Sequence, residues 1–224
     1  MKILVLADIH GAYQKIDKVL ERENKFDLII SPGDITDMYT GPEEFSQLDI
    51  ADIVIQKLLI PQKPVFCIPG NHDPFDVVNI FEEYGVNIHN KIRTFNGITY
   101  LGFGGAQTPF KTLYEPTEEE IGDSLTQLAS HLTNPAVIIV HNPPHNTIND
   151  KTIQGQHVGS PTIRDFIEKH QPLLCLCAHI YEGRGDDKIG KTVTFYPGPL
   201  LEGYYGIVEI LGERVKTSIK KIPH

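Results

Sequence analysis

The 224-residue sequence lacks the features that would direct it into a membrane or out of the cell. No apolar run approaches the roughly 18 residues that a membrane-spanning helix needs. The apolar stretch near Met1 is only about five residues long, whereas the apolar region of a signal peptide has about 7 to 15. We therefore expect a soluble, cytoplasmic protein that does not bind membranes.

Cysteine and basic residues are also scarce. The three cysteines, Cys67, Cys175 and Cys177, form an odd number within apolar runs, which predicts reduced core residues and no disulfide framework. Twenty Lys and Arg against 29 Asp and Glu give a net charge of −9. Because no basic stripe is visible, this balance argues against a nucleic-acid partner. The sequence does not decide whether the chain forms a homo-oligomer.

Apolar runs alternate with stretches of helical periodicity, without an internal repeat or linker. This pattern predicts an α/β fold with a largely parallel central sheet, in a single domain over 1–224. Expected strands cover 3–7, 28–30, 65–68, 136–140, 173–177, 192–195, 205–211 and 214–219, with a hairpin at 91–102; expected helices cover 12–23, a stretch from about 50 that Pro61 ends, a stretch that Thr117 caps, and 160–170. The longest irregular stretch, 142–159, is the expected functional loop.

Five of the apolar runs end on residues that commonly bind metals. These are Asp8 and His10; Asp34; Asn71, His72 and Asp73; His141; and His179. Each alone is explained as an ordinary turn or capping residue. Five such strand ends together indicate a shared site, because sites form at the carboxyl edge of parallel sheets.

The residue types at these strand ends favour a particular class of metal ion. Carboxylate, imidazole and amide groups without thiolates suit divalent ions such as Mn, Fe, Zn or Ni and argue against a structural zinc site. A carboxylate such as Asp34 can bridge two ions. A pair of ions stabilises the attacking and leaving oxygens of a displacement at phosphorus.

The ordered blocks Asp8-Ile9-His10, Gly33-Asp34, Gly70-Asn71-His72-Asp73, His141 and the histidine of "CAHIY" resemble the calcineurin-like metallophosphoesterases. The family pattern is D-x-H, G-D, G-N-H-[DE], H and G-H-x-H, and the blocks span residues 8 to 181. The resemblance implies two facing mixed sheets flanked by helices, an α/β/β/α sandwich with a centre of two metal ions.

The resemblance also implies a role for each matching residue. Asp8, His10 and Asp34 would bind the first ion, and Asp34, Asn71, His141 and His179 the second. His72 would contact the phosphate, together with Asn71, and protonate the leaving oxygen, oriented by Asp73. A carboxylate beside an imidazole fixes its tautomer and favours its charged form, as a general acid requires.

The sequence departs from the family pattern at the first metal site. Tyr181 stands where a second histidine would bind the first ion, and Tyr196 replaces the asparagine of a late N-P-G block. A phenol with a pKa near 10 is a poor ligand for a divalent ion, but a trivalent iron could deprotonate it. The first site is therefore expected to be either weak or selective for iron, with Tyr181 as its remaining candidate ligand.

Other residues are weaker candidates for the site. Arg184 could bind a substrate phosphate with its planar guanidinium, or pair with Asp186 or Asp187 at the surface. His145 and His157 lie in the 142–159 loop and could line the pocket. The remaining histidines are expected at the surface: His89, His131, His170 and His224.

Two functions remain open from the sequence. The first is hydrolysis of a phosphodiester or a small phosphorylated metabolite, in which a hydroxide held at the metal ions attacks phosphorus. The alternative is a non-catalytic binding or scaffold protein that keeps the phosphoesterase fold, an alternative that Tyr181 raises. The intact remainder of the motif favours the enzyme.

Overall fold

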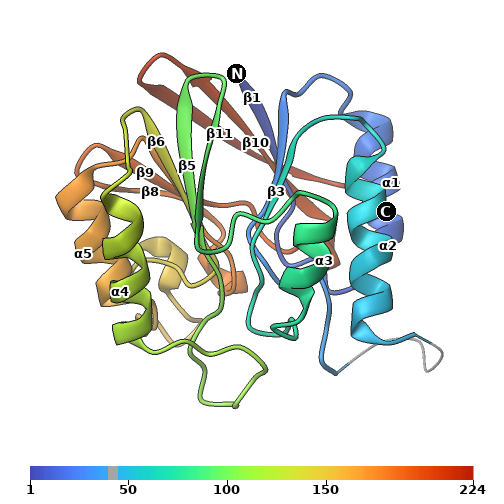
Figure 1. Ribbon diagram of the computed structural model, residues 1–224, viewed down its shortest axis with the longest axis horizontal. Coiled ribbons are helices and arrows are strands. Elements are labelled where there is room, and N and C mark those ends of the chain that lie inside the picture. The colour runs from blue at the N-terminus through green and yellow to red at the C-terminus, as the bar shows by residue number, and fades with distance from the viewer. Residues whose placement is uncertain (40–44, 224) are drawn as a thin grey trace.

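The computed structural model describes residues 1–39 and 45–223, and its strands form two sheets that pack face to face. Figure 1 shows the two sheets in the middle of the molecule with helices on both outer sides. The expected two-sheet sandwich is confirmed, whereas the single central sheet suggested by the hydrophobic pattern is wrong. The expected surface position of His224 lies outside the described residues.

The first sheet has the strand order β11-β10-β1-β2-β3. Its strands are β1 (Lys2–Val5), β2 (Leu28–Ser31), β3 (Val65–Cys67), β10 (Tyr204–Leu211) and β11 (Arg214–Lys221). β1, β2 and β3 run parallel, with Ile3 opposite Leu28, whereas β10 and β11 are antiparallel to their neighbours. Three parallel strands therefore end at the same edge.

The second sheet has the order β4-β5-β6-β7-β9-β8. Its strands are β4 (Lys91–Phe95), β5 (Ile98–Phe103), β6 (Ala136–Val140), β7 (Leu174–Leu176), β8 (Gly185–Ile189) and β9 (Thr192–Tyr196). The four central strands are parallel, and the edge strands β4 and β8 are antiparallel. The hairpin expected around Asn96-Gly97 is the β4–β5 pair.

Helices cover the outer face of each sheet. α1 (Tyr13–Arg22), α2 (Gln47–Leu59) and α3 (Val77–Glu83) pack on the first sheet, and α4 (Glu118–Ala129) and α5 (Pro161–His170) on the second. The caps expected from Thr117 and Ser160 are present. Short 3-10 turns lie at Ile148–Asp150 (η1), Tyr181–Gly183 (η2) and Leu200–Glu202 (η3).

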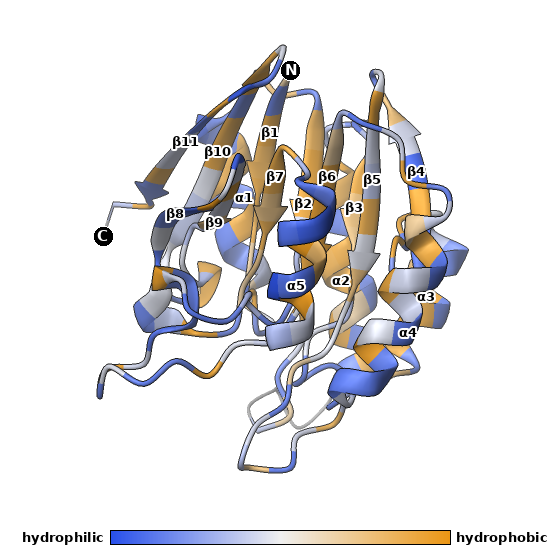
Figure 2. Cartoon of the chain, turned by 90° about the vertical axis from the view of Figure 1, so that its left-hand side faces the viewer, coloured by the Kyte–Doolittle hydropathy of each residue, from blue (hydrophilic) through white to orange (hydrophobic). Residues whose placement is uncertain are grey.

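The core between the sheets comes from strand residues with almost no polar atoms. Ile3 and Ile30 of the first sheet and Val137 and Leu176 of the second are fully buried in one apolar cluster. Figure 2 shows the strands as mostly hydrophobic and the outer sides of α4 and α5 as mostly hydrophilic. The three cysteines are free and buried, as expected for core residues. This packing fixes the relative position of the two sheets.

Two elements, α3 and β8, were not predicted from the sequence, and the surface position predicted for one histidine is wrong. α3 is short, and the charged edge strand β8 lacks an apolar run. His89 was expected at the surface but is only 6% exposed, because it lies against β5. Its Nδ1 accepts a hydrogen bond from the Gly104 amide at 2.9 Å. Of the other two histidines expected at the surface, His131 is exposed and His170 is half-buried.

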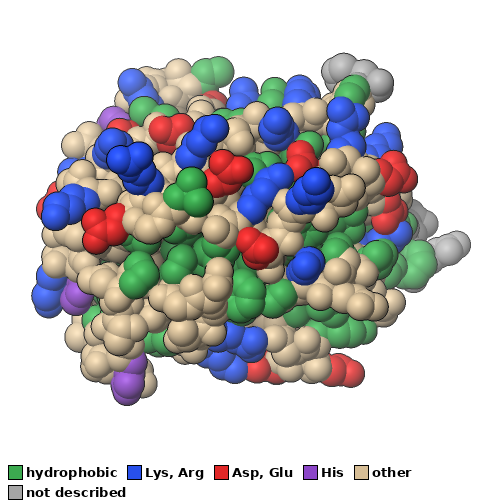
Figure 3. Space-filling model, turned by 90° about the horizontal axis from the view of Figure 1, so that it is seen from above, with side chains coloured by type: hydrophobic (Ala, Val, Ile, Leu, Met, Phe, Trp, Pro, Cys, Tyr) green, Lys and Arg blue, Asp and Glu red, His purple; other side chains and the backbone are tan. Residues whose placement is uncertain are grey.

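The surface carries no broad basic face in the view shown. Figure 3 shows the end of the molecule opposite the strand ends that carry the candidate site, where acidic, basic and apolar side chains are interspersed. No helix within the described residues is long and apolar enough to cross a membrane.

Candidate metal and catalytic site

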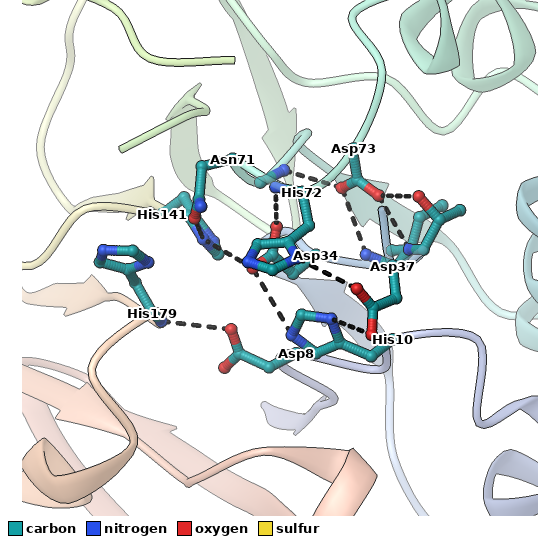
Figure 4. Close-up of polar contacts among 12 residues, drawn as sticks. Asp8, His10, Asp34, Asp37, Asn71, His72, Asp73, His141 and His179 are labelled. Carbon is teal, nitrogen blue, oxygen red and sulfur yellow. Dashed lines mark hydrogen bonds and ion pairs between the residues drawn. The ribbon is translucent and has the colours of Figure 1, made fainter. Parts of the chain in front are cut away.

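The polar ends of β1, β2, β3, β6 and β7 meet at one edge of the two sheets. Figure 4 shows that their side chains point toward one another. The residues brought together are Asp8, His10, Asp34, Asn71, His72, His141 and His179. The convergence expected from the strand ends is therefore present.

Backbone hydrogen bonds lock these loops to one another. The Asp8 and His10 amides donate to the carbonyls of Gly33 and Asp34 at 3.2 and 2.9 Å. The His72 amide donates to Asp34 Oδ1 at 2.8 Å, and the His179 amide to Asp8 Oδ1 at 3.2 Å. Each loop thus positions a functional residue of another loop.

Four candidate ligands have a positive φ angle, a backbone conformation that is unfavourable for residues other than glycine. The φ angles are 45° at Asp8, 46° at His10, 51° at Asp34 and 78° at His179. Such residues cost roughly 1 to 3 kcal/mol each and cluster at functional sites. The surrounding hydrogen bonds hold these side chains in directions that an ordinary loop would not give them.

Two glycines allow the loops to approach this closely. A Cβ on Gly70 would lie 2.0 Å from Asp34 Oδ1, and one on Gly33 would lie 2.5 Å from His141 Nδ1. Both distances are far shorter than any non-bonded contact. The G-D and G-N-H-D blocks therefore need glycine because their backbones pack directly against the site.

On one side of Asp34, three atoms with lone pairs face the same small space. His141 Nε2 lies 2.9 Å from Asn71 Oδ1 and 3.3 Å from Asp34 Oδ2. Its Nδ1 lies 2.8 Å from the Pro32 carbonyl, which accepts only, so Nδ1 carries a proton. In neutral His141, Nε2 would therefore carry a lone pair that faces the lone pairs of Asn71 Oδ1 and Asp34 Oδ2. A cation at this point resolves the conflict.

Electrostatics at His141 point the same way. Burial alone would lower the pKa of His141, but the carboxylates of Asp34 and Asp8 raise it to about 9. In the metal-free chain a proton therefore supplies the positive charge that the carboxylates require. His179 differs, because burial and nearby His141 lower its pKa to about 3, leaving a neutral imidazole that can bind a metal.

On the other side of Asp34, buried polar atoms lack hydrogen-bond partners among the described residues, and the ring nitrogens of His10 face carboxylates only at 3.6 and 3.9 Å. Both ring nitrogens of His10 and Oδ2 of Asp8 are buried without a hydrogen bond. Burial and the neighbouring Asp34 raise the pKa of Asp8, although His141 and His10 oppose this. Unsatisfied buried groups of this kind are costly, so this half of the site also fits a cation.

The clusters meet the geometric requirement for metal binding. In the groups Asp8–His10–Asp34 and Asp34–His141–His179, one ligand atom per residue lies within 4.8 Å of the others. Asp34 belongs to both groups. A third group, His10–Asp37–His72, lies beside them.

The structure corrects the role expected for Asp73. Its carboxylate accepts hydrogen bonds from the amides of Ile35, Thr36 and Gly70 and from the Thr36 hydroxyl, at 2.8 to 3.2 Å. Asp73 is fully buried, so these four donors take the place of water around its carboxylate. It therefore holds the loops of β2 and β3 together and does not orient His72.

The carboxylate beside the His72 ring belongs to Asp37. His72 Nδ1 lies 3.2 Å from Asp37 Oδ1, and His10 Nδ1 lies 3.9 Å from Asp37 Oδ2. The sequence analysis missed Asp37. The available signal was its place in "GDITD", three residues after Asp34 on the same loop.

A cleft of about 800 Å³ opens over these residues. Two segments, 107–112 and 152–158, supply walls, and Tyr39 and Tyr181 add aromatic surface. Among the described lining residues there is no lysine or arginine. Tyr181 lies beside the first group, with its ring centroid 6.1 Å from that of His10. The expected functional loop thus forms part of the cleft.

Three other candidates lie outside the lining of this cleft. The exposed Arg184 stacks over the ring of Tyr204, with Cζ 4.0 Å from the centroid, so the phosphate contact suggested for it is not supported. His145 and His157 instead face buried Asp150, with Nδ1 to carboxylate distances of 3.3 and 2.6 Å. They hold the 142–159 loop together through Asp150 and do not line the cleft.

Comparison with known proteins agrees with this geometry. Residues 1–183 match the model of the calcineurin-like phosphoesterase family. The uncharacterized protein MJ1162 of Methanocaldococcus jannaschii is 36% identical over 206 residues, which cover 89% of this chain and 88% of the relative.

Solved structures share the fold at low identity. TT1561 of Thermus thermophilus has a TM-score of 0.76 at 18% identity, with 99% of each chain covered. A dimetal phosphatase from Danio rerio has a TM-score of 0.70 at 11% identity, covering 100% of this chain and 96% of its own. The chain therefore belongs to the calcineurin-like phosphoesterase family, a family of metal-dependent phosphoesterases.

Proposed function

We propose that the chain hydrolyses a phosphodiester or a small phosphorylated metabolite with two divalent ions bound on either side of Asp34. The observation that carries this proposal is the sharing of Asp34 between two ligand clusters at the floor of one open cleft. Two bound cations would polarise the phosphoryl oxygens and lower the pKa of a bound water.

The remaining chemistry would come from the chain itself. His72 lines the cleft beside Asp34 and is 22% exposed at its side chain, so a substrate can reach its ring. With Nδ1 held against Asp37, Nε2 is free to give its proton to the oxygen that leaves phosphorus. Asn71 would assist by contributing its amide oxygen to the second ion and lining the phosphate subsite.

The charge of the cleft supports a substrate with one phosphate. Its described lining contains the carboxylates of Asp34 and Glu182 and no lysine or arginine, so additional phosphates would find no cationic side chain. A phosphodiester carries one negative charge near neutral pH, whereas a monoester carries up to two. The cleft therefore favours the diester.

Activity and metal content measured on one sample test this proposal. The metal-free chain is loaded with Mn²⁺ and assayed with bis(p-nitrophenyl) phosphate and p-nitrophenyl phosphate. We expect a higher kcat/KM for the diester. Asp34→Ala and Asn71→Ala should each lower it by at least the roughly 100-fold that loss of a supporting partner alone can cost. Unchanged turnover in both variants would reject the mechanism.

A non-catalytic scaffold is the second candidate, because Tyr181 replaces a ligand of the first ion. Metal analysis of the same purified chain separates the two functions. Two bound ions per chain support the enzyme. No bound ion and no turnover with any metal would support the scaffold.

A further inference from the structure

The side-chain amide of Asn71 is fixed at both of its ends. Its Oδ1 faces His141 Nε2 at 2.9 Å, on the side where the second ion is proposed. Its Nδ2 donates a hydrogen bond to Thr112 Oγ1 at 3.1 Å. An asparagine can bind a metal ion only through its oxygen, so the direction of this amide matters for the site.

The Thr112 hydroxyl can pair only with the NH₂ end of the Asn71 amide. Its hydroxyl donates to Glu115 Oε1 at 2.6 Å, and an ionised carboxylate only accepts hydrogen bonds. The Thr112 hydroxyl proton is therefore used, and its oxygen faces Asn71 as an acceptor. A flipped Asn71 would set its oxygen against that oxygen and turn its NH₂ group toward the metal ligands.

Glu115 is held in its charged, accepting form. Besides the Thr112 hydroxyl, its Oε1 accepts the Thr108 hydroxyl and the Thr112 amide, each at 2.6 Å. Desolvation would raise the pKa of Glu115, but these hydrogen bonds outweigh it and hold that pKa below its usual value. The carboxylate thus organises the whole turn from 108 to 115.

The main chain ties the same segment to Asn71. The amides of Leu113 and Tyr114 both donate to the Asn71 carbonyl, at 2.9 and 3.1 Å. Residues 107–110 and Thr112 line the cleft. One cleft wall is therefore connected to a candidate metal ligand through both backbone and side chain.

We propose that Thr112 and Glu115 are positioning residues that orient the Asn71 amide and thereby set the affinity of the second ion site. The inference rests on the proposed function, in which Asn71 is a ligand of that ion. By thermodynamic linkage, binding of the ion would in turn order the wall formed by 107–112.

The test is calorimetric titration of the metal-free chain with Mn²⁺. Thr112→Val keeps the size of the side chain and removes the hydroxyl, and Thr112→Ser keeps the hydroxyl. We expect Thr112→Val to weaken one of two ion sites by about 10- to 100-fold, the usual effect of losing a partner of a ligand. Thr112→Ser should remain close to the wild type in ion affinity, and the unfolding midpoint of each variant, measured without metal, shows that the chain is folded before the titration.

A second background shows whether Thr112 acts through Asn71. In Asn71→Ala, the further change Thr112→Val should cause no additional loss of ion affinity, because the amide it orients is gone. Equal losses in both backgrounds would overturn the proposal, as would two unchanged sites in Thr112→Val. Hydrogen exchange of 107–114 supplies an independent readout. Mn²⁺ should slow it in the wild type and less so in Thr112→Val.

The outcomes distinguish this inference from the proposed function. Two ion sites of which one depends on Thr112, in a chain without phosphoesterase turnover, would support the positioning role and reject the enzyme. Turnover in the wild type together with unchanged ion affinities in Thr112→Val would reject the positioning role alone. A wild-type chain that binds no ion would overturn both.

Discussion

The imidazole of His72 faces the carboxylate of Asp37 at 3.2 Å, whereas the adjacent Asp73 is buried in hydrogen bonds to three backbone amides. The two aspartates therefore divide two tasks. Asp37 stands beside the side chain proposed as general acid, and Asp73 fixes the loops beneath it. Substitutions at the two positions should affect different measurements.

We expect Asp37→Asn to slow turnover. The neutral amide would no longer hold His72 Nδ1 against a carboxylate, so the ring would be less well oriented toward the leaving oxygen, and substrates whose leaving oxygen needs a proton should lose the most activity. General acids typically contribute about 10²- to 10⁴-fold, and kcat for an alkyl ester should fall by at least about tenfold. For a p-nitrophenyl ester, whose leaving group departs readily, the loss should be smaller. Equal losses for both leaving groups would contradict a role in proton donation.

For Asp73→Asn the expected effect is on stability. The new NH₂ group would face amide donors that now bond to a carboxylate oxygen, leaving buried groups unsatisfied. Each such group costs about 1 to 3 kcal/mol, so the free energy of unfolding should fall by about 2 to 4 kcal/mol. Urea denaturation of the metal-free chain measures it. A wild-type midpoint would show that the loops hold without this carboxylate.

Tyr181 provides a test of the first ion site. Burial raises the pKa of its phenol, and Asp8 and Asp34 raise it further, which opposes metal binding as a phenolate. We expect Tyr181→His to raise the affinity of the Asp8–His10–Asp34 group for Mn²⁺ by about tenfold or more, since imidazole is a good ligand. Tyr181→Phe should bind like the wild type. A visible absorption band of the iron-loaded chain that disappears in Tyr181→Phe would instead support an iron-selective site.

Buried His89 should make stability depend on pH. Burial lowers its pKa to about 4, against a usual value near 6.5. Between these values the unfolded chain binds more protons, so its contribution is fully present above pH 6.5 and is lost as pH falls toward 4. The difference between these two pKa values, which burial of the ring causes, corresponds to about 3 kcal/mol.

The matched variant for this effect is His89→Gln, which keeps a neutral acceptor. Its free energy of unfolding should fall less steeply than that of the wild type between pH 6.5 and 4. Identical slopes would show that His89 takes up its proton without penalty in the folded chain.

Arg184→Ala should leave kcat/KM for bis(p-nitrophenyl) phosphate within about twofold of the wild type. Its guanidinium stacks on Tyr204 and lies outside the cleft, so the expected loss is a surface cation–π contact of about 0.5 to 1 kcal/mol in stability. A large rise in KM would place this guanidinium at the phosphate after all.

The sequence predicted the candidate ligands because each one follows an apolar run at a strand end. Asp8, Asp34 and His141 are of this kind. Parallel pairing brings the ends of neighbouring strands together within each sheet, and the facing of the two sheets brings the two edges together. The capping signals at Thr117 and Ser160 worked for the same reason, since they act locally. Pairing of distant strands left no local signal, so the division into two sheets came only from the family resemblance.

Residues whose partners are distant in sequence were not predictable. Asp73 follows His72 directly, but the turn points its carboxylate toward Ile35 and Thr36. Nothing in the composition around His89 indicates that it is buried beside β5. Likewise Thr112 and Glu115 belong to an irregular segment that contacts Asn71 only in the folded chain.

The two walls of the cleft differ in how they are attached, and this has a consequence for redesign. The 107–112 wall is hydrogen-bonded to Asn71 through Thr112, so replacing it would disturb this candidate metal ligand at the same time. The 152–158 wall instead forms a turn closed by the Lys151–His157 bridge and is attached to Asp150 through His157 and Val158. A segment of another length could be grafted at 152–158 without removing the hydrogen bonds to Asn71, so this is the wall to vary when substrate choice is tested.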